Sequence, residues 1–163
     1  MKKELLDNRT GKASEIKTYL EVTKKNSFLE FYFQALDSSL NSYSNKDNDA
    51  LYNGDVVEIF LDLGFEDYFE FEVAPNGATF VATIKNIKPT FISSDFFKSD
   101  VVIDGNNYYV KINLDLSKFD YKFIKFNAFR IETKGIRSEY ILQALSPTLT
   151  NSFHVREKFV EIA

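Results

Sequence analysis

Apolar and polar residues alternate with a period of two along most of this chain, and no long helical period interrupts them. The clearest run covers residues 68–74 (YFEFEVA), and a second covers residues 55–63 (DVVEIFLDL). This period is typical of β-strands, because successive side chains of a strand point to opposite faces of the sheet. A shift by one residue would bury the acidic side chains, so we expect the apolar set to be core: Val57, Ile59, Phe69, Phe71 and Val73.

Turn residues separate these runs at the spacing of an all-β domain. Asn76-Gly77 is a strong hairpin signal, because both residues tolerate a positive φ, and Asp104-Gly105-Asn106-Asn107 indicates a second hairpin. Residues 28–36 are rich in Phe, Leu and Tyr, which is typical of a strand buried on both faces. The strands that we expect cover residues 16–25, 28–36, 55–63, 68–74, 78–85, 100–104, 107–114, 121–133, 138–145 and 158–162.

About ten short strands without strand–helix alternation favour an antiparallel β-sandwich over a parallel α/β fold. The expected architecture is two-sheeted, jelly-roll or immunoglobulin-like. The chain of 163 residues has the length of one domain, so we predict a single domain over residues 1–163. Residues 1–15 lie outside the strand pattern and are the segment most open to flexibility.

Composition narrows the possible partners and cofactors. The 20 Lys and Arg residues against 24 Asp and Glu residues leave a net charge of −4, so a nucleic-acid partner is not expected. No stretch approaches the roughly 18 apolar residues of a membrane span, so no membrane partner is expected either. With no Cys and one His, thiolate and multi-histidine metal sites are excluded, whereas carboxylate sites stay open. The first residues lack the apolar core of a signal peptide, so we expect a cytoplasmic chain as written, or a secreted one if a leader has been removed.

Four carboxylates follow the polar face of two neighbouring runs, namely Glu58, Asp62, Glu70 and Glu72. If the two runs pair as a hairpin, opposed Cβ atoms lie about 4.5–5.5 Å apart, which is near the ~5 Å carboxyl spacing of a retaining glycosidase. We prefer the simpler interpretation that these residues solvate the outer face of the sheet. Catalysis is disfavoured because no second feature selects one of them as a proton donor.

Three further residues have both a functional and a structural interpretation. Tyr52 shares the parity of Glu58 and would place an aromatic ring beside the carboxylates, although Tyr is also simply a good strand former. Arg130 needs a partner, for which Glu58 or one of the other strand carboxylates is the obvious candidate, and it would form an ion pair or reach a ligand hydroxyl. His154 has no obvious nucleophile nearby in the sequence and is expected to be a hydrogen-bonded structural residue.

The alternating acidic loop at Asn45, Asp47 and Asp49 has the spacing of calcium ligands. However, Ala50 stands at the glycine position of an EF-hand and Val56 at its bidentate Glu position. The EF-hand motif therefore fails, and we predict no metal ligands here. An irregular calcium-binding loop stays open.

Four segments together resemble family 9 carbohydrate-binding modules and their DOMON-like relatives. Residues 51–61 (LYNGDVVEIFL) are similar to the aromatic–x–G/D–D–x–V–E–I–F strand of that family, and residues 68–77 (YFEFEVAPNG) to its Y-x-F-E-V-x-P-N-G hairpin. Residues 126–130 (FNAFR) resemble the N-F-x-R strand. Residues 146–159 resemble the closing S-P…F-H-x-P-E-x-F-G segment, with Arg156 at the Pro position and Val160 at the Gly position. The order of the segments is the same as in the family.

The resemblance implies a sandwich whose sugar-binding members hold a terminal saccharide between two Trp side chains. Tyr52 stands at the first Trp position and Leu145 at the second, Glu58 at the family's Glu and Arg130 at its Arg. The implied ligand-binding residues are Tyr52, Glu58, Glu72, Asn76 and Arg130. Family members often carry structural calcium; we predict no other cofactor, and the chain shows no clear ligand set for calcium.

We therefore expect a non-catalytic carbohydrate-binding module whose partner is a saccharide or polysaccharide. The alternative is a structural or protein-interaction β-sandwich that has lost sugar binding, which the absence of Trp favours. A small enzyme that acts on glycosides through the strand carboxylates is the least favoured hypothesis. The sequence leaves the oligomeric state open.

Overall fold

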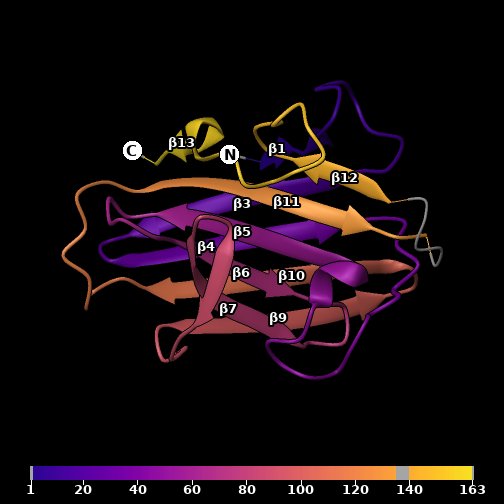
Figure 1. The fold of residues 1–163 in the computed structure, drawn as a ribbon. Helices are drawn as coiled ribbons and strands as arrows, with labels where there is room; N and C mark the ends of the chain where they lie inside the picture. The colour runs from indigo at the N-terminus through magenta and orange to yellow at the C-terminus, as the bar shows by residue number, and fades with distance from the viewer. Residues whose placement is uncertain (1, 135–139, 163) are drawn as a thin grey trace.

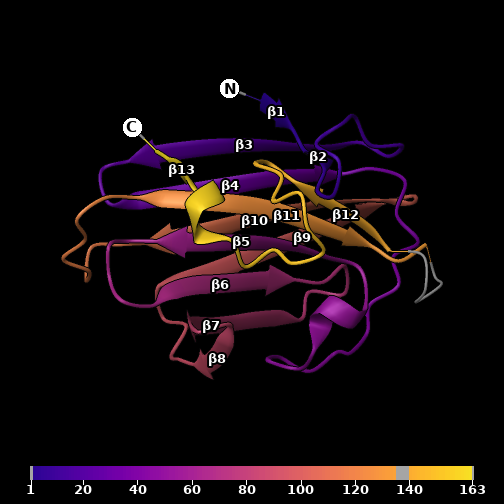
Figure 2. The same cartoon turned by 45° about the horizontal axis from the view of Figure 1, so that its top comes forward.

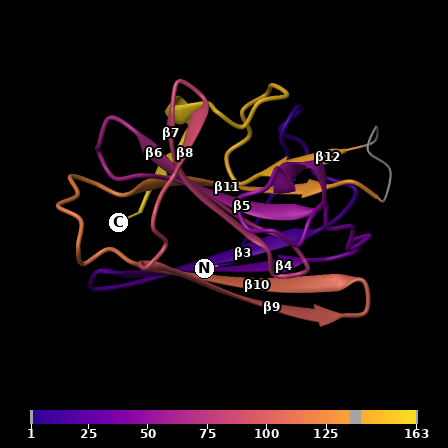
Figure 3. The same cartoon turned by 60° about the horizontal axis from the view of Figure 1, so that its bottom comes forward.

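The strands form two antiparallel sheets that pack face to face in the computed structural model, which describes residues 2–134 and 140–162. Figure 3 shows the two layers, with β9 and β10 in one and β5 and β11 in the other. The smaller sheet contains, in order, β1 (Lys2–Glu4), β3 (Thr18–Lys25), β4 (Phe28–Ala35), β10 (Asn107–Asp115) and β9 (Phe97–Asp104). The eight-stranded sheet contains β2 (Leu6–Asp7), β12 (Ile141–Ala144), β11 (Lys125–Glu132), β5 (Val56–Asp62), β6 (Tyr68–Val73), β7 (Thr79–Lys85) and β8 (Lys88–Phe91), with β13 (Val160–Glu161) paired to β11.

The predicted all-β antiparallel sandwich is confirmed, with three strands that the sequence pattern missed, β1, β2 and β8. The only helical elements of the described residues are two short 3-10 turns, η1 (Leu51–Asn53) and η2 (Arg156–Lys158). Neither they nor any other described helix has the length and apolarity needed to cross a membrane. The end of the predicted strand 138–145 that covers residues 138 and 139 lies outside the described residues.

The N-terminal segment, which lies outside the strands that the sequence pattern predicts, contributes to both sheets through β1 and β2. Lys3 pairs with Leu20 in the small sheet, and Asp7 pairs with Gln143 in the large one. Leu5, between the two short strands, is fully buried in the core. Because burial of such a side chain contributes about 1.5–3 kcal/mol, this segment is held to the sandwich.

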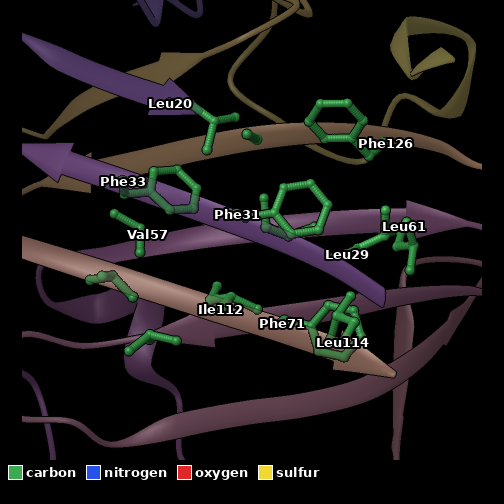
Figure 4. Close-up of a cluster of buried hydrophobic side chains, with 14 of the residues drawn as sticks. Leu20, Leu29, Phe31, Phe33, Val57, Leu61, Phe71, Ile112, Leu114 and Phe126 are labelled. Atoms are coloured by element: carbon green, nitrogen blue, oxygen red, sulfur yellow. The ribbon is translucent and has the colours of Figure 1, made fainter. Parts of the chain in front are cut away.

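The main core fills the space between the two sheets (Figure 4). All five residues that the alternation predicts as core belong to it, and each is at most 5% exposed. Aromatic rings supply much of its volume, and Phe71 stacks on Phe97 at a centroid distance of 5.3 Å. The binary pattern of the two acidic strands therefore determines which of their faces points inward.

A second apolar cluster covers the outer face of the large sheet, where the sequence predicted solvent. The C-terminal segment, residues 145–159, crosses this face above β11 and β5 (Figure 2). Phe153 stacks on Phe129 at 4.1 Å, and Phe159 lies edge-on to Tyr68 at 5.2 Å. As a result, β5 and β6 are buried on both faces. The expectation that residues 28–36 form a strand buried on both faces is wrong, because buried residues alternate with more exposed ones along β4.

The predicted hairpin turns are present between β6 and β7 and between β9 and β10. Gly77 has a φ of +89° and donates its N–H to the carbonyl of Ala74 at 2.9 Å. Gly105 has a φ of +61°. A residue with a Cβ is strained in this left-handed region, so glycine is required by the backbone rather than by side-chain packing.

Candidate functional site

A cleft of about 890 Å³ opens on the outer face of the large sheet. Its floor contains three glutamates from the middle of the sheet, Glu58 on β5 and Glu70 and Glu72 on β6 (strands placed in Figure 1). Aromatic side chains form much of its lining: Tyr52, Phe60, Phe80, Phe91, Tyr140 and Phe153. A hollow with apolar walls and a few convergent polar groups is the usual form of a small-molecule site.

The three glutamates form one buried cluster, which we call the glutamate triad (Glu58, Glu70 and Glu72). Glu58 is directly opposite Glu72 in the pairing of β5 and β6, and one carboxylate oxygen from each of the three residues lies within 4.8 Å of the other two. Their exposed fractions are 2%, 7% and 0% in sequence order. The predicted sharing of one face is confirmed, but the preferred interpretation of a solvated outer face is wrong, because the C-terminal segment covers this side of the sheet.

Burial is the main cause of the protonation behaviour of the triad. It raises the pKa of Glu58 and of Glu72 well above the usual range, and the negative charge of the neighbouring carboxyls adds to the effect. Burial also raises the pKa of Glu70 to about 7. Neither oxygen of Glu72 accepts a hydrogen bond from a donor group of the described residues. The triad therefore retains protons near neutral pH, because like charges this close oppose full ionisation.

Tyr52 lies in η1 at the rim of the cleft, with 50% of its surface exposed. The adjacent backbone is fixed from across the cleft, because the hydroxyl of Tyr140 donates to the carbonyl of Asn53 at 3.0 Å. An exposed ring on an anchored turn is available for stacking. The structure thus brings Tyr52, Glu58 and Glu72, three of the five predicted site residues, to one cleft.

Arg130 lies on the opposite face of the sheet, and the prediction that it pairs with Glu58 is wrong. It is opposite Val57 in the pairing of β11 and β5, so its side chain enters the space between the sheets. There its Nη1 donates to Thr18 Oγ1 at 2.9 Å, and its Nη2 donates to Glu132 Oε1 at 3.2 Å. Arg130 is fully buried and does not line the cleft, because residues 58 and 130 have opposite parity on their paired strands.

Asn76 also lies outside the cleft lining, in the turn between β6 and β7. Its Oδ1 accepts the N–H of Ala78 at 3.0 Å, and its Nδ2 donates to the carbonyl of Ser44 at 2.9 Å. These bonds shape the hairpin and attach it to the polar loop formed by residues 41–54. In the described structure the Asn76 side chain is therefore bound within the turn and to this loop, outside the cleft lining.

Asp62, the fourth predicted carboxylate, is separate from the triad. Arg156 holds it in a bidentate ion pair, with Nε–Oδ2 at 2.7 Å and Nη2–Oδ1 at 2.8 Å. Burial alone would raise the pKa of Asp62. The hydrogen bonds from Arg156 and from the backbone N–H of Gly64 outweigh burial, so this pKa lies below its usual value. Arg156, at the family's Pro position, therefore fastens the C-terminal segment to β5.

His154 is part of the lining and is held by other side chains. Its ring stacks on Phe60 at a centroid distance of 4.8 Å, and its Nδ1 is hydrogen bonded to the hydroxyl of Tyr68. Burial lowers the pKa of His154, so the imidazole is neutral at pH 7. This agrees with the predicted structural role.

The side chains of the calcium-like loop bind the protein itself. Asp47 Oδ1 accepts the N–H of Thr79 at 2.9 Å, and Asn48 Oδ1 accepts the N–H of Val81 at 3.0 Å. These contacts attach the polar loop to β7, at one side of the cleft. Asp47, one of the three alternating residues, is thus bound to the backbone of β7.

Solved structures with this architecture include carbohydrate-binding modules. A family 9 carbohydrate-binding module from Caldicellulosiruptor kristjanssonii in complex with glucose matches with a TM-score of 0.72 and 18% identity, over 98% of this chain and 82% of that one. A family 9 module from the same organism in complex with cellotriose matches with a TM-score of 0.62 and 16% identity, over 87% and 71%. This chain has a family 9 carbohydrate-binding module fold.

A protein of Bacteroides uniformis, provisionally assigned as carbohydrate-binding, matches with a TM-score of 0.82 and 14% identity, over 98% of this chain and 84% of that one. Identities of 14–18% establish the fold alone. No family model and no curated protein matched the sequence. The DOMON-like assignment stays a prediction.

Two motif residues of this family 9 fold have structural roles that sequence reasoning missed. Buried Asp55 accepts hydrogen bonds from the N–H of Asn41 and the N–H of Thr133, each at 2.7 Å, and so joins the polar loop to the end of β11. Asn127 holds Ser146 through both its amide nitrogen and its oxygen. The sequence does carry a signal for these roles, because Asp55 directly precedes an apolar strand and Asn127 lies within one. A polar side chain that is buried in such a position requires a hydrogen-bond partner.

Leu145, at the second Trp position of the resemblance, packs against the main core. It contributes nothing to the cleft lining. The other rings of the lining come from Phe80 and Phe91 on β7 and β8 and from Phe153 in the C-terminal segment. The cleft therefore has aromatic walls, but not from the position that the resemblance implied.

Proposed function

We propose that this chain is a non-catalytic carbohydrate-binding module that holds a saccharide in the cleft of the large sheet. The observation that supports this most is the half-exposed ring of Tyr52 at the rim of a cleft with carboxyls at its floor. The apolar C–H face of a sugar would stack on the ring, and its hydroxyls would donate to Glu58 and Glu70. A carboxyl group accepts hydrogen bonds from hydroxyls in its protonated form as well as in its ionised form.

The solved neighbours support a saccharide as the ligand class, since two of them contain glucose or cellotriose. Their fold is shared with this chain, and the cleft lies on the outer face of the larger sheet. The identity of the sugar is part of the proposal and is addressed in the next subsection.

The state of the carboxyls supports binding rather than hydrolysis. A retaining glycosidase needs one ionised nucleophile and one protonated acid about 5 Å apart, with pKa values that differ. In the triad burial raises the pKa of all three carboxyls, and no donor of the described residues keeps Glu72 ionised. Incubation with oligosaccharides should therefore release no new reducing ends, whereas turnover would contradict the proposal.

Isothermal titration against mono- and disaccharides tests the proposal with two tyrosine variants. Tyr52→Ala should weaken binding at least tenfold, about 1.4 kcal/mol, with an unchanged melting temperature. Tyr43→Ala is the matched control, because Tyr43 is 47% exposed and does not line the cleft. Equal losses in both variants, or no loss in either, would argue against the cleft as the binding site.

The alternative is a protein-interaction domain without a sugar ligand. The exposed apolar residues Ile87 and Phe91 favour it, with exposed fractions of 70% and 51% at the rim of the cleft. A wild-type protein that binds no saccharide would support this alternative.

A further inference from the structure

The glutamate triad brings three carboxyls together where the described residues supply no compensating cation, so the triad retains protons. Glu72 is fully buried, both of its oxygens lack a donor among the described residues, and its carboxyl lies against those of Glu58 and Glu70. Such a group costs free energy unless a proton or another positive charge neutralises it. The triad is thus incomplete as a purely structural cluster.

The charged and titratable groups around the triad do not provide that neutralisation. Arg9 is the one Lys or Arg side chain in the described lining, and its guanidinium donates to Asn151 Oδ1 at 2.7 Å and to the carbonyl of Tyr140. The pKa of His154 is lowered by burial, which leaves the ring neutral. The remaining titratable groups that line the cleft or adjoin the triad are acidic or phenolic, namely Asp49, Tyr52, Tyr68 and Tyr140.

The walls of the cleft suit an organic cation. Tyr52 and Phe91 expose half of their surface, and Phe80 is in edge-on contact with Phe91 at 5.2 Å. Aromatic faces attract ammonium groups by about 0.5–2 kcal/mol, and they also stack on sugar rings. The cleft volume of about 890 Å³ is that of a small organic ligand.

We propose that the saccharide bound in this cleft carries a protonated amino group, as in an amino sugar, and that Glu58 and Glu70 at the floor bind this ammonium with Glu72 behind them. The inference rests on the proposed function and names its ligand class. An ammonium donates up to three hydrogen bonds to the carboxyls and replaces the proton that the triad otherwise retains. A neutral sugar supplies hydroxyl donors but no positive charge, so the triad keeps its proton.

A divalent metal is the rival occupant, and the structure favours it less. Calcium takes six to eight oxygen ligands, whereas one carboxylate oxygen from each of only three residues converges in the triad. The aromatic walls and most of the cleft volume would have no part in binding a metal. We therefore argue for the ammonium group and include calcium in the test.

Isothermal titration slightly below neutral pH compares three disaccharides of similar shape with the whole chain. They are the β-1,4-linked disaccharide of glucosamine, its fully N-acetylated form and cellobiose. We expect the amino disaccharide to bind at least tenfold more tightly than the other two. In Glu70→Gln the preference for the amino disaccharide over cellobiose should fall at least fivefold.

Glu21→Gln is the matched control, because Glu21 is exposed on β3 of the other sheet. Glu72→Gln is the second variant, and thermal melts of all three variants verify the fold. Equal affinity for the amino disaccharide and cellobiose would overturn the inference and leave the proposed function intact. No binding of any disaccharide would overturn both. Tight binding of calcium chloride alone, lost in Glu72→Gln, would overturn the inference in favour of a metal site.

Discussion

Two clusters of buried charge lie on opposite faces of the same sheet, and they are built in opposite ways. On the inner face, Arg130 donates to Glu132, whose second oxygen accepts the N–H groups of Ser39 and Lys134 at 3.1 and 2.8 Å. On the outer face, the glutamate triad brings together three acidic side chains that retain protons, and Glu72 has no donor in the described structure.

The difference separates a structural cluster from a site. The inner cluster combines opposite charges and joins three parts of the chain, since Arg130 also bonds to Thr18 on β3. Charges paired in this way are costly to disrupt. The triad is instead strained by its own repulsion, and strained groups in a cleft are candidates for ligand binding. Four predictions test this contrast.

The largest effect is expected from Arg130→Met. The substitution leaves Glu132 buried without its cationic partner, so the free energy of unfolding should fall by about 3–5 kcal/mol. Urea denaturation measures the change. Arg9→Met, a substitution of an exposed arginine, is the control and should stay within about 0.5 kcal/mol of wild type. Similar stability of the two variants would show that the inner cluster is not structural.

Glu72→Gln should change the free energy of unfolding in the opposite direction and increase it at neutral pH by about 1 kcal/mol or more. The folded triad retains protons that the unfolded chain releases above its ordinary pKa of 4.5, so wild-type stability should fall as the pH rises from about 5 through the value of about 7 for Glu70. The variant should show a shallower fall. Melting curves between these pH values provide the measurement, and a wild-type stability that rises over this range would refute the assignment.

Asp62→Asn tests a carboxylate that does have a partner, on the same outer face. Its pairing with Arg156 lowers the pKa of Asp62 in the folded state. The ion pair therefore contributes to the free energy of unfolding at pH values above the unfolded-state pKa, and this contribution is lost as the pH falls through the folded-state pKa. We expect a loss of about 1–2 kcal/mol at neutral pH, because Arg156 is partly exposed. Thermal melts at neutral and strongly acidic pH should show the difference shrinking in acid. A constant difference would indicate that the ion pair contributes little.

Gly77→Val should lower the free energy of unfolding by somewhat more than about 1 kcal/mol. The positive φ of Gly77 strains a β-branched residue, although a Cβ there would meet no atom within 4 Å. The hairpin that carries Glu70 and Glu72 would then be less stable without a change in the triad itself. A melting temperature equal to that of wild type would contradict the turn assignment.

Sequence patterns were sufficient for the main strands and for part of the site. Alternation assigned the inward faces of β5 and β6, and a one-residue shift would have buried charge between the sheets. The same parity placed Glu58 and Glu72 together, and the polar loop before β5 positioned Tyr52 near them. The short strands β1, β2 and β8 escaped detection, because two to four residues carry too little periodic signal.

The errors concern contacts between distant segments. Charge alone predicts an ion pair between Arg130 and Glu58. The antiparallel register instead places Arg130 opposite Val57, where it bonds to Thr18 of the other sheet. The acidic face was expected to meet water, but Phe153 and Phe159 of the C-terminal segment cover it. Local period determines which side chains share a face and says nothing about what packs against that face.

By itself, the sequence determined a two-sheet antiparallel sandwich, the residues of its core, its hairpin turns and the shared face of the acidic side chains, because these depend on periodicity and backbone conformation over a few residues. The tertiary structure decided the rest. It buried the glutamate triad, paired Arg130 with Glu132 and formed the cleft, because register and long-range packing bring together residues that lie far apart in the chain.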